Sequence, residues 1–175
     1  MYDKPDERGQ RLIGVLKEVQ KISGFGQKVL PEGHAMGVAC ATDVNTPVAQ
    51  VAEVKLENGA IKVLKVYCVI DPGLVINPDG VKAQCEGAIS MGLSASMFEE
   101  LNIEDGKVTP NQYLQYQMAQ IRDIPDIEVS ILSTGDAPRG VGEPPMGPIA
   151  PAIANAVATL TGTRMTKMPF KQYQF

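Results

Sequence analysis

Apolar side chains recur at helical spacing close to the start of the chain. The positions are Leu12, Val15, Leu16, Val19 and Ile22. Because residues three and four apart share one face of a helix, the pattern predicts an amphipathic helix that ends at the glycines of residues 23–27. The polar residues 1–10 before it are expected to form a flexible lead-in, and residues 11–175 a single domain.

Four apolar runs predict β-strands. They cover residues 36–42, 48–56, 61–70 and 127–133. The second and third runs are joined by a short connection that contains Asn58-Gly59. Asn-Gly suits a two-residue hairpin turn, because both central residues must adopt positive φ. The sequence therefore predicts an antiparallel hairpin here, and Asp105-Gly106 predicts a second, shorter one.

Two further helices are predicted. Asn77 is a suitable N-cap for a helix whose first residue is Pro78. Residues 87–98 of this helix are almost uncharged and rich in small side chains, so we expect it to be buried within a larger body. Residues 113–125 are ambiguous between a loop and a short helix. The last helix has an apolar stripe at Ile149, Ile153, Ala156, Val157 and Leu160, and ends at Gly162.

This succession of elements predicts one α+β domain, in which helices pack on an antiparallel or mixed sheet. The net charge is −4 and no basic cluster is present, so no nucleic-acid partner is expected. No apolar run approaches the roughly 18 residues that span a bilayer. The polar, acidic N-terminal stretch does not resemble a signal peptide, so a soluble protein is expected.

Cysteine and histidine usage argues against several kinds of site. Cys40, Cys68 and Cys85 are widely spaced among apolar neighbours, so we expect buried thiols and no metal site built by this chain. His34 is the only histidine. A serine hydrolase triad would have to use it, but the chain has no Gly-x-Ser-x-Gly motif, and a catalytic role for His34 is not expected.

The stretch RGVGEPPMGP, residues 139–148, places one carboxylate, Glu143, among glycines and prolines. It lies between a predicted strand and a predicted helix, where free backbone N–H groups favour an anionic ligand. A carboxylate desolvated in such a rigid loop would have a raised pKa, which suits a general base. The alternative is an ordinary surface turn, because turns of this composition are common.

The motif VGEPP, followed by GPIAPAIANAVATLTG, is similar to the carboxyl-terminal segment of the molybdenum-binding subunit of xanthine dehydrogenase and aldehyde oxidase-type hydroxylases. Upstream, Val81, Gln84, Glu86 and Gly87 match that family's Val-x-x-Gln-x-Glu-Gly core. The segments EGAISMGLSASMFEEL, IPDIEV and TRMTKMPF most resemble the isoquinoline 1-oxidoreductase beta-subunit branch. The resemblance covers residues 10–170 and implies the fold of the C-terminal molybdopterin-binding domain.

The resemblance also implies roles for individual residues. Glu143 is expected to lie beside molybdenum and to act as a base while an oxygen derived from water attacks an electron-poor carbon. Gly140, Val141 and Gly142 are expected to form the loop beside the metal. Gln84 and Gly87 correspond to a helix that packs near the pterin. The alternative for Gln84 is that it only satisfies neighbouring backbone groups.

The cofactor implied is a molybdenum–pterin, either molybdopterin or its dinucleotide form, held mainly by the pterin dithiolene and not by cysteine. The implied partners are the remaining part of the molybdenum subunit, an iron–sulfur subunit, and an N-heterocycle or aldehyde substrate. Parent enzymes are cytoplasmic or periplasmic. The chain lacks the family's earlier cofactor-binding half and has Asp71-Pro72-Gly73 where Asp-Cys-Gly is frequent. We therefore expect the isolated chain to be inactive and to self-associate through the small-residue helix of residues 87–97, or to be a non-catalytic remnant or scaffold module.

Overall fold

A computed structural model of the chain describes residues 7–135 and 137–175. Its α-helices and strands are α1 (Glu7–Ser23), β1 (His34–Asp43), β2 (Thr46–Glu57), β3 (Ala60–Ile70), α2 (Pro78–Met97), β4 (Asn102–Glu104), β5 (Lys107–Thr109), β6 (Asp126–Ile131) and α3 (Ile149–Thr161). Three short 3₁₀ turns complete it: η1 (Ile121–Asp123), η2 (Pro144–Met146) and η3 (Phe170–Gln172). The predicted α+β class is confirmed.

The main sheet has four strands in the order β1-β2-β3-β6. The first three form an antiparallel meander, whereas β6 pairs in parallel with β3 after the crossover through α2. The predicted hairpin turn between β2 and β3 is confirmed, since Asn58 and Gly59 have φ values of 54° and 78°. Tight turns therefore connect β1, β2 and β3, and the long crossover through α2 connects β3 to β6.

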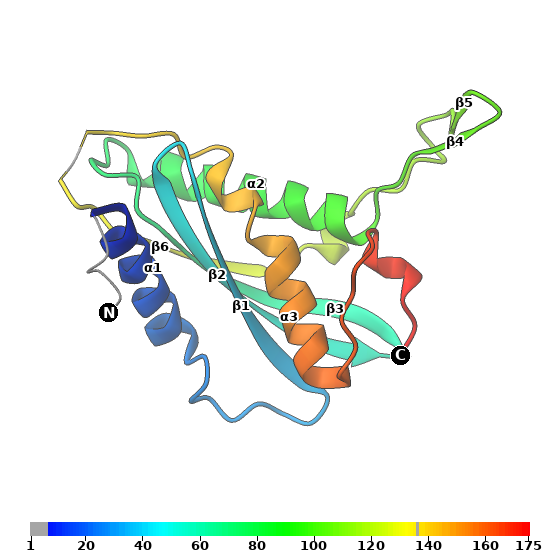
Figure 1. Ribbon diagram of the computed structural model, residues 1–175, viewed down its shortest axis with the longest axis horizontal. Coiled ribbons are helices and arrows are strands. Elements are labelled where there is room, and N and C mark those ends of the chain that lie inside the picture. Colours follow the sequence, from blue (N-terminus) through cyan, green and yellow to red (C-terminus); the bar gives the residue numbers. More distant parts are fainter. Residues whose placement is uncertain (1–6, 136) are drawn as a thin grey trace, which may run out of the picture.

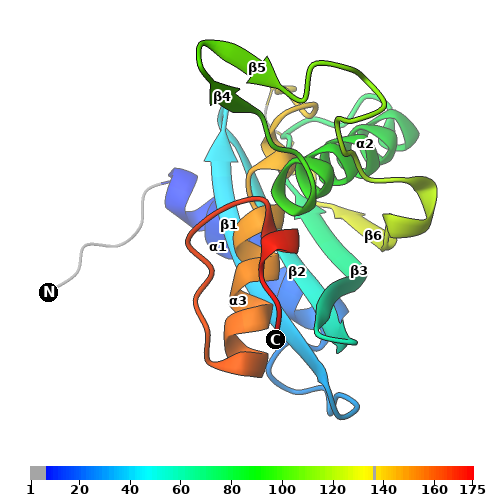
Figure 2. The ribbon, with the colours of Figure 1, turned by 90° about the vertical axis from the view of Figure 1, so that its right-hand side faces the viewer.

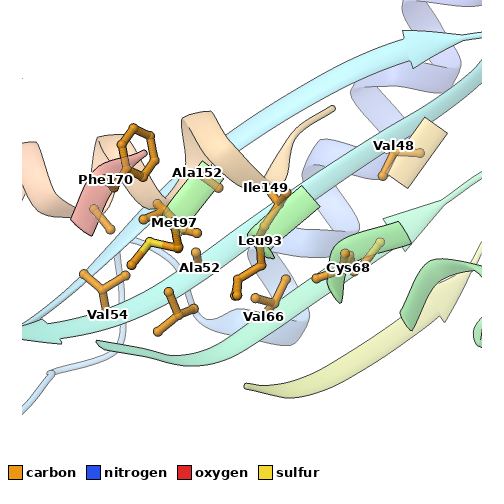
Figure 3. Close-up of a cluster of buried hydrophobic side chains, with 14 of the residues drawn as sticks. Val48, Ala52, Val54, Val66, Cys68, Leu93, Met97, Ile149, Ala152 and Phe170 are labelled. Atoms are coloured by element: carbon orange, nitrogen blue, oxygen red, sulfur yellow. The ribbon is translucent and has the colours of Figure 1, made fainter. Parts of the chain in front are cut away.

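Helices cover both faces of the sheet. Helix α1 lies on one face, whereas α2 and α3 lie on the other (Figures 1 and 2). Alternate residues of β2 point to opposite faces, so Val51 packs with α1 residues and Val48 with residues of α2 and α3. The larger core lies on the α2–α3 face, where Leu93, Ile149 and Phe170 meet the sheet (Figure 3).

One predicted boundary needs correction, and one ambiguous segment is resolved. Helix α1 begins at Glu7, so residues 7–10 are helical and are not part of a flexible lead-in. The negative charge of Glu7 in the first turn favours this helix start, because it interacts favourably with the positive end of the helix dipole. Residues 1–6 lie outside the described part. The ambiguous stretch 113–125 contains only the short turn η1 as helix.

Helix α2 starts as predicted, with the Asn77 side chain accepting a hydrogen bond from the Gly80 N–H at 3.1 Å. The expectation of apolar, uncovered faces on this helix was wrong in part. Its large apolar residues are buried against the chain's own sheet, and only Met91 is an exposed large hydrophobe on it. The small residues Gly87 and Ala95 form part of the opposite, exposed face.

Exposed apolar side chains gather instead on the segment between α2 and β6. There β4 and β5 form the second predicted hairpin, which projects away from the body (Figure 1). Tyr113 and Leu114 beside it are 99% and 100% exposed, and Ile103 on β4 is 76% exposed. We call residues 101–118 the arm. A surface of this kind marks a contact site for another polypeptide.

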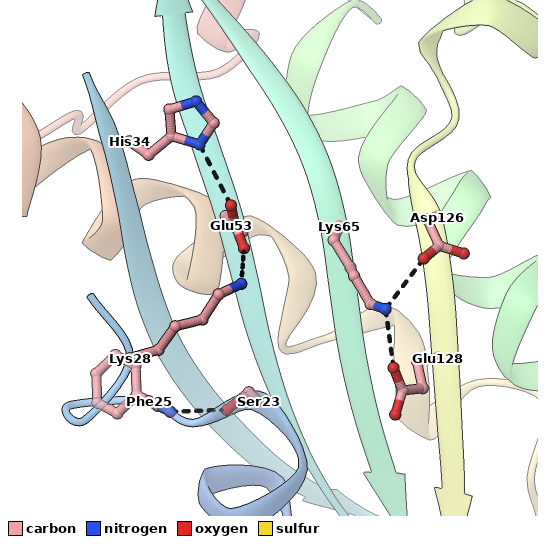
Figure 4. Close-up of polar contacts among 8 residues, drawn as sticks. All are labelled: Ser23, Phe25, Lys28, His34, Glu53, Lys65, Asp126 and Glu128. Carbon is pink, nitrogen blue, oxygen red and sulfur yellow. Dashed lines mark hydrogen bonds and ion pairs between the residues drawn. The ribbon is translucent and has the colours of Figure 1, made fainter. Parts of the chain in front are cut away.

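A buried carboxylate fastens the loop after α1 to the sheet. Glu53 on β2 lies 3.0 Å from Lys28 Nζ and 3.2 Å from His34 Nδ1 (Figure 4). Burial acts to raise the pKa of the Glu53 carboxyl, but the hydrogen bonds with Lys28 and His34 outweigh it and hold that pKa below its ordinary value of 4.5. His34 therefore has a structural partner, in agreement with the absence of a triad motif.

This arrangement predicts a pH-dependent stability. A carboxyl with a lowered pKa stabilises the fold above its unfolded pKa, and the effect is lost as the pH falls through the folded pKa. We expect Glu53→Gln to lower the free energy of unfolding by about 1–2 kcal/mol at pH 7. The difference from the parent should shrink as the pH falls through the lowered pKa of Glu53 and should be lost below it, as measured by urea unfolding at several pH values. An equal difference at pH 7 and pH 3 would contradict this account.

A second ion cluster holds β6 against β3. Lys65 Nζ lies 2.9 Å from Glu128 Oε2 and 3.1 Å from Asp126 Oδ2 (Figure 4). It also lies 4.8 Å from the ring centre of Tyr67. The hydrogen bonds that Lys65 donates to these two carboxylates raise its pKa. The cluster sits at the start of the parallel pairing, where Lys65 is opposite Asp126. It helps to fix the register of the strand that leads to the Glu143 loop.

The expectation for the cysteines holds for two of the three. Cys68 and Cys85 are fully buried between β3 and α2. The adjacent Cys85 thiol and burial raise the pKa of the Cys68 thiol, so it is neutral and packs as a small apolar group. Cys40 is exposed, contrary to the prediction. It lies in the second half of β1, which is an edge strand of the sheet.

Candidate active site

The loop of residues 139–147 follows β6 in the chain, contains η2 and leads to α3. Each of its three predicted cofactor-side residues contacts a different part of the chain. A Cβ on Gly140 would lie 3.0 Å from Val44 in the β1–β2 turn, and one on Gly142 would lie 3.1 Å from Gln84 Nε2 on α2. Val141, half-buried, packs against the larger core. The glycines allow the loop to approach both elements closely.

The structure brings Gln84, Gly87 and Glu143 to one side of the molecule. Gln84 and Gly87 are three residues apart on α2 and both exposed, so they share one face of the helix. A Cβ on Gly87 would meet no atom within 4 Å. Gly142, next to Glu143, faces Gln84 across the junction of the loop and α2. Gln84 and Gly87 therefore share one face of α2, and the loop approaches that helix at Gly142, next to Glu143.

Glu143 is exposed and immediately precedes η2. Its carboxylate forms no hydrogen bond or ion pair with the residues that the structure describes. The expected desolvation of this group is therefore not supplied by the described chain. The N-terminus of α3 does not lie directly at Glu143 either, because η2 intervenes and the first helical residue, Ile149, is buried.

A hollow of about 310 Å³ lies beside the loop, between it and the start of α2. Its lining includes Gln84, Val141, Asn77, Val81, Ile76 and Pro138. The lining is mostly apolar, with a few amide groups. Among residues 7–135 and 137–175, no group of three or more His, Cys, Asp or Glu side chains is placed to hold a metal ion. A group bound in this hollow would contact apolar side chains, the amides of Asn77 and Gln84, and Arg139.

Sequence reasoning missed the residues that fix the loop from below. Thr46 Oγ1 on β2 donates to the Gly140 carbonyl at 2.8 Å, and Gln50 Nε2 on the same strand donates to the Pro145 carbonyl at 2.6 Å. Both residues are fully buried. The available signal was the single glutamine inside the apolar run Val48-Ala-Gln-Val-Ala. A polar residue in a buried strand normally has a specific hydrogen-bond partner.

The Asp71-Pro72-Gly73 turn also contributes. Asp71 is almost fully buried, lies 3.0 Å from Arg11 Nε, and accepts the Gly73 N–H at 3.1 Å. The Pro72 carbonyl accepts the Arg139 N–H at 3.0 Å, which fixes the beginning of the loop. The Asp71-Pro72-Gly73 turn, which stands where Asp-Cys-Gly is frequent in the family, therefore helps β2 to position the loop of residues 139–147.

Comparison with known proteins gives this α+β domain a class. The family of the molybdopterin cofactor-binding domain matches residues 32–125. The isoquinoline 1-oxidoreductase subunit beta of Brevundimonas diminuta is 36% identical, over 92% of this chain and 21% of that protein. The membrane-bound aldehyde dehydrogenase [pyrroloquinoline-quinone] of Gluconacetobacter polyoxogenes is 33% identical, over 95% of this chain and 23% of that protein.

Solved structures agree. Quinoline 2-oxidoreductase from Pseudomonas putida 86 has a TM-score of 0.59 at 26% identity, covering 67% of this chain and 16% of that one. Reconstituted CO dehydrogenase from Oligotropha carboxidovorans has a TM-score of 0.63 at 22% identity, covering 71% and 17%, which supports the fold. The chain belongs to the molybdopterin cofactor-binding domain family of molybdenum-dependent oxidoreductases, as the motifs predicted. It spans less than a quarter of the length of these relatives.

The site can be tested against the cofactor of this family. An exposed glycine with free space beside it on α2, a glycine-rich loop and a hollow between them offer backbone surface to a large planar group. Gln84 supplies amide hydrogen-bonding atoms at the same place. These residues fit one side of a molybdenum–pterin cofactor.

In the described part of the chain, no helix is long and apolar enough to cross a membrane.

Proposed function

We propose that this chain supplies the catalytic base, Glu143, to a molybdenum hydroxylase that oxidises an electron-poor carbon of an N-heterocycle or an aldehyde. The observation behind the proposal is the state of Glu143. Its carboxylate is exposed and unpaired within the described chain, yet its backbone is held at both ends by buried donors. A fixed carboxylate without a partner is suited to accept a proton from a bound reactant.

The reaction converts a C–H bond and water into a C–OH bond, two protons and two electrons. Glu143 would accept one proton at a carboxylate oxygen as the water-derived oxygen adds to the carbon. The cofactor, when bound, supplies the two-electron acceptor. Gln84 and Gly87 would hold the pterin side of the group through an amide and through close approach of backbone. The electrons would then pass to an iron–sulfur subunit.

Covering the site requires more polypeptide than the described residues provide. Glu143 and the exposed face of α2 lie open on one side, and a desolvated site is where a carboxylate base is most effective. We propose that the remaining part of a molybdenum subunit covers them and that the isolated chain is inactive. The relatives' greater length is consistent with such a part.

The test is reconstitution. The chain is produced together with a polypeptide that supplies the remaining part of a molybdenum subunit, and the purified pair is assayed for molybdenum. Oxidation of isoquinoline and of benzaldehyde is then followed with an artificial electron acceptor. Molybdenum retention with turnover by the pair, and neither by the chain alone, supports the proposal. A cofactor-loaded pair that oxidises neither compound would favour the alternative, a non-catalytic module that keeps the fold.

The isolated chain is expected to self-associate through the arm. Its side chains Ile103, Tyr113 and Leu114 are more exposed than any large apolar residue of α2. Sedimentation velocity should therefore detect dimers or larger species whose population falls in the double variant Ile103→Lys/Leu114→Lys. The matched variant Met91→Lys on α2 should leave association unchanged. If only Met91→Lys produced a monomer, the small-residue face of α2 would be the contact surface instead.

A further inference from the structure

The Glu143 loop is attached to the sheet by two side chains of a single strand. Thr46 and Gln50 of β2 are four residues apart, so both point to the α2–α3 face of the sheet. Their acceptors, the carbonyls of Gly140 and Pro145, lie on either side of Glu143 in the sequence. The backbone of Glu143 is thus suspended between two fixed points on a rigid element.

The Pro145 carbonyl needs a side-chain donor for a reason visible in the sequence. In a 3₁₀ turn, a carbonyl accepts the N–H of the residue three positions later. For Pro145 that residue is Pro148, which has no N–H. Pro145 is buried, so its carbonyl would otherwise be left unpaired away from water. Gln50 reaches it from the neighbouring strand at 2.6 Å.

Stability alone does not account for a glutamine at this position. Gln50 is fully buried, its Oε1 has no hydrogen-bond partner in the described chain, and its other contact is a weak one from Nε2 to Cys68 Sγ at 3.8 Å. An apolar residue of similar shape would avoid this unpaired atom but would leave the buried Pro145 carbonyl unpaired instead, so the two costs to stability roughly offset each other. The amide therefore contributes mainly through the direction it imposes on Pro145.

We infer that Thr46 and Gln50 are positioning residues that hold the Glu143 loop in place for the reaction. The inference on catalysis rests on the proposed function, whereas the attachment of the loop does not. The residues touch neither substrate nor cofactor and act only through the Gly140 and Pro145 carbonyls. Displacement of a catalytic group by about 1 Å can lower a rate about 100-fold.

The attachment is tested by amide hydrogen exchange over residues 139–147 in the full 175-residue chain. We expect Gln50→Met, which keeps length without a donor, to raise exchange in this segment about 10-fold or more while Tm changes by no more than about 4 °C. Thr46→Val should loosen the Gly140 end, and Thr46→Ser, which keeps the hydroxyl, should restore the parental exchange. Ser96→Ala is the control, because it removes a buried hydroxyl bonded only within α2.

The consequence for catalysis is measured in the cofactor-loaded complete enzyme as the rate of cofactor reduction by benzaldehyde or isoquinoline in a single turnover. Gln50→Met should lower this rate about 10- to 100-fold at unchanged cofactor content. Faster exchange with an unchanged rate would support the attachment and count against Glu143 as the base. Unchanged exchange in both Gln50→Met and Thr46→Val would overturn the inference. If Gln50→Met does not fold, the comparison of Thr46→Val with Thr46→Ser decides it.

Discussion

Glu143→Gln is expected to lower kcat of the cofactor-loaded complete enzyme about 10²–10⁴-fold, without loss of folding or cofactor content. The amide keeps the size of the side chain and one acceptor oxygen, but it cannot take up a proton at neutral pH. The substitution therefore removes about 3–5 kcal/mol of transition-state stabilisation. Folding should change little, because Glu143 is exposed and its side chain forms no hydrogen bond or ion pair with the described residues.

The measurement is the rate of the reductive half-reaction under single-turnover conditions, which separates chemistry from product release. Glu104→Gln, an exposed carboxylate on β4, is the matched control and should behave as the parent. If Glu143→Gln reduced the cofactor at near the parental rate, Glu143 would be only a turn residue. Asp at the same position should recover part of the activity, since it restores a base on a shorter side chain.

Gly37→Ala should destabilise the fold by about 3 kcal/mol or more. Gly37 lies on β1 where α3 crosses it, and a Cβ there would overlap the backbone of Ala152 and Ala156. Backbone atoms in a packed helix cannot move aside as a flexible side chain can, so α3 as a whole would be displaced. Because α3 follows η2 directly, the Glu143 loop would shift with it.

Thermal and urea unfolding of the full chain test this prediction, with Tm expected to fall by about 6–12 °C. Gly87→Ala is the control. Gly87 is exposed within α2 and has free space beside it, so alanine there should raise stability by about 0.5–1 kcal/mol through helix propensity. Equal effects of the two substitutions would show that α3 does not approach β1 as closely as described.

The sequence allowed prediction of those parts of the fold that depend on neighbouring residues. Asn58-Gly59 predicted the hairpin because the conformation that the turn requires is rare for other residue types. Asn77-Pro78 predicted the start of α2 because a cap and a proline act within one turn. The family motifs then brought Gln84, Gly87 and the 140–143 loop together as candidates, and in the structure the loop approaches α2 where Gly142 lies beside Gln84.

The rest depended on distant contacts that local patterns do not encode. Gln50 bonds to a residue 95 positions away, so nothing near it in the sequence identified its partner. The sequence did not show which faces of α2 are covered by this chain and which would be covered by a missing partner. Small apolar residues are suited to both kinds of contact. Cys40 was mispredicted for a similar reason, since its exposure follows from the place of β1 at the edge of the sheet.

The parallel pairing of β3 with β6 has a consequence for the order in which the molecule folds. Strands β1, β2 and β3 are joined by tight turns, so their contacts close short loops and can form early. Strand β6 can join β3 only after the intervening 55 residues, 71–125, have been accommodated, which is entropically slower. The Glu143 loop follows β6 in the chain. The two residues that attach it, Thr46 and Gln50, lie on β2 and are in place only after β1, β2 and β3 have paired. We therefore expect the catalytic segment to be the last part of the chain to acquire its native conformation, and the first to be released when the chain begins to unfold.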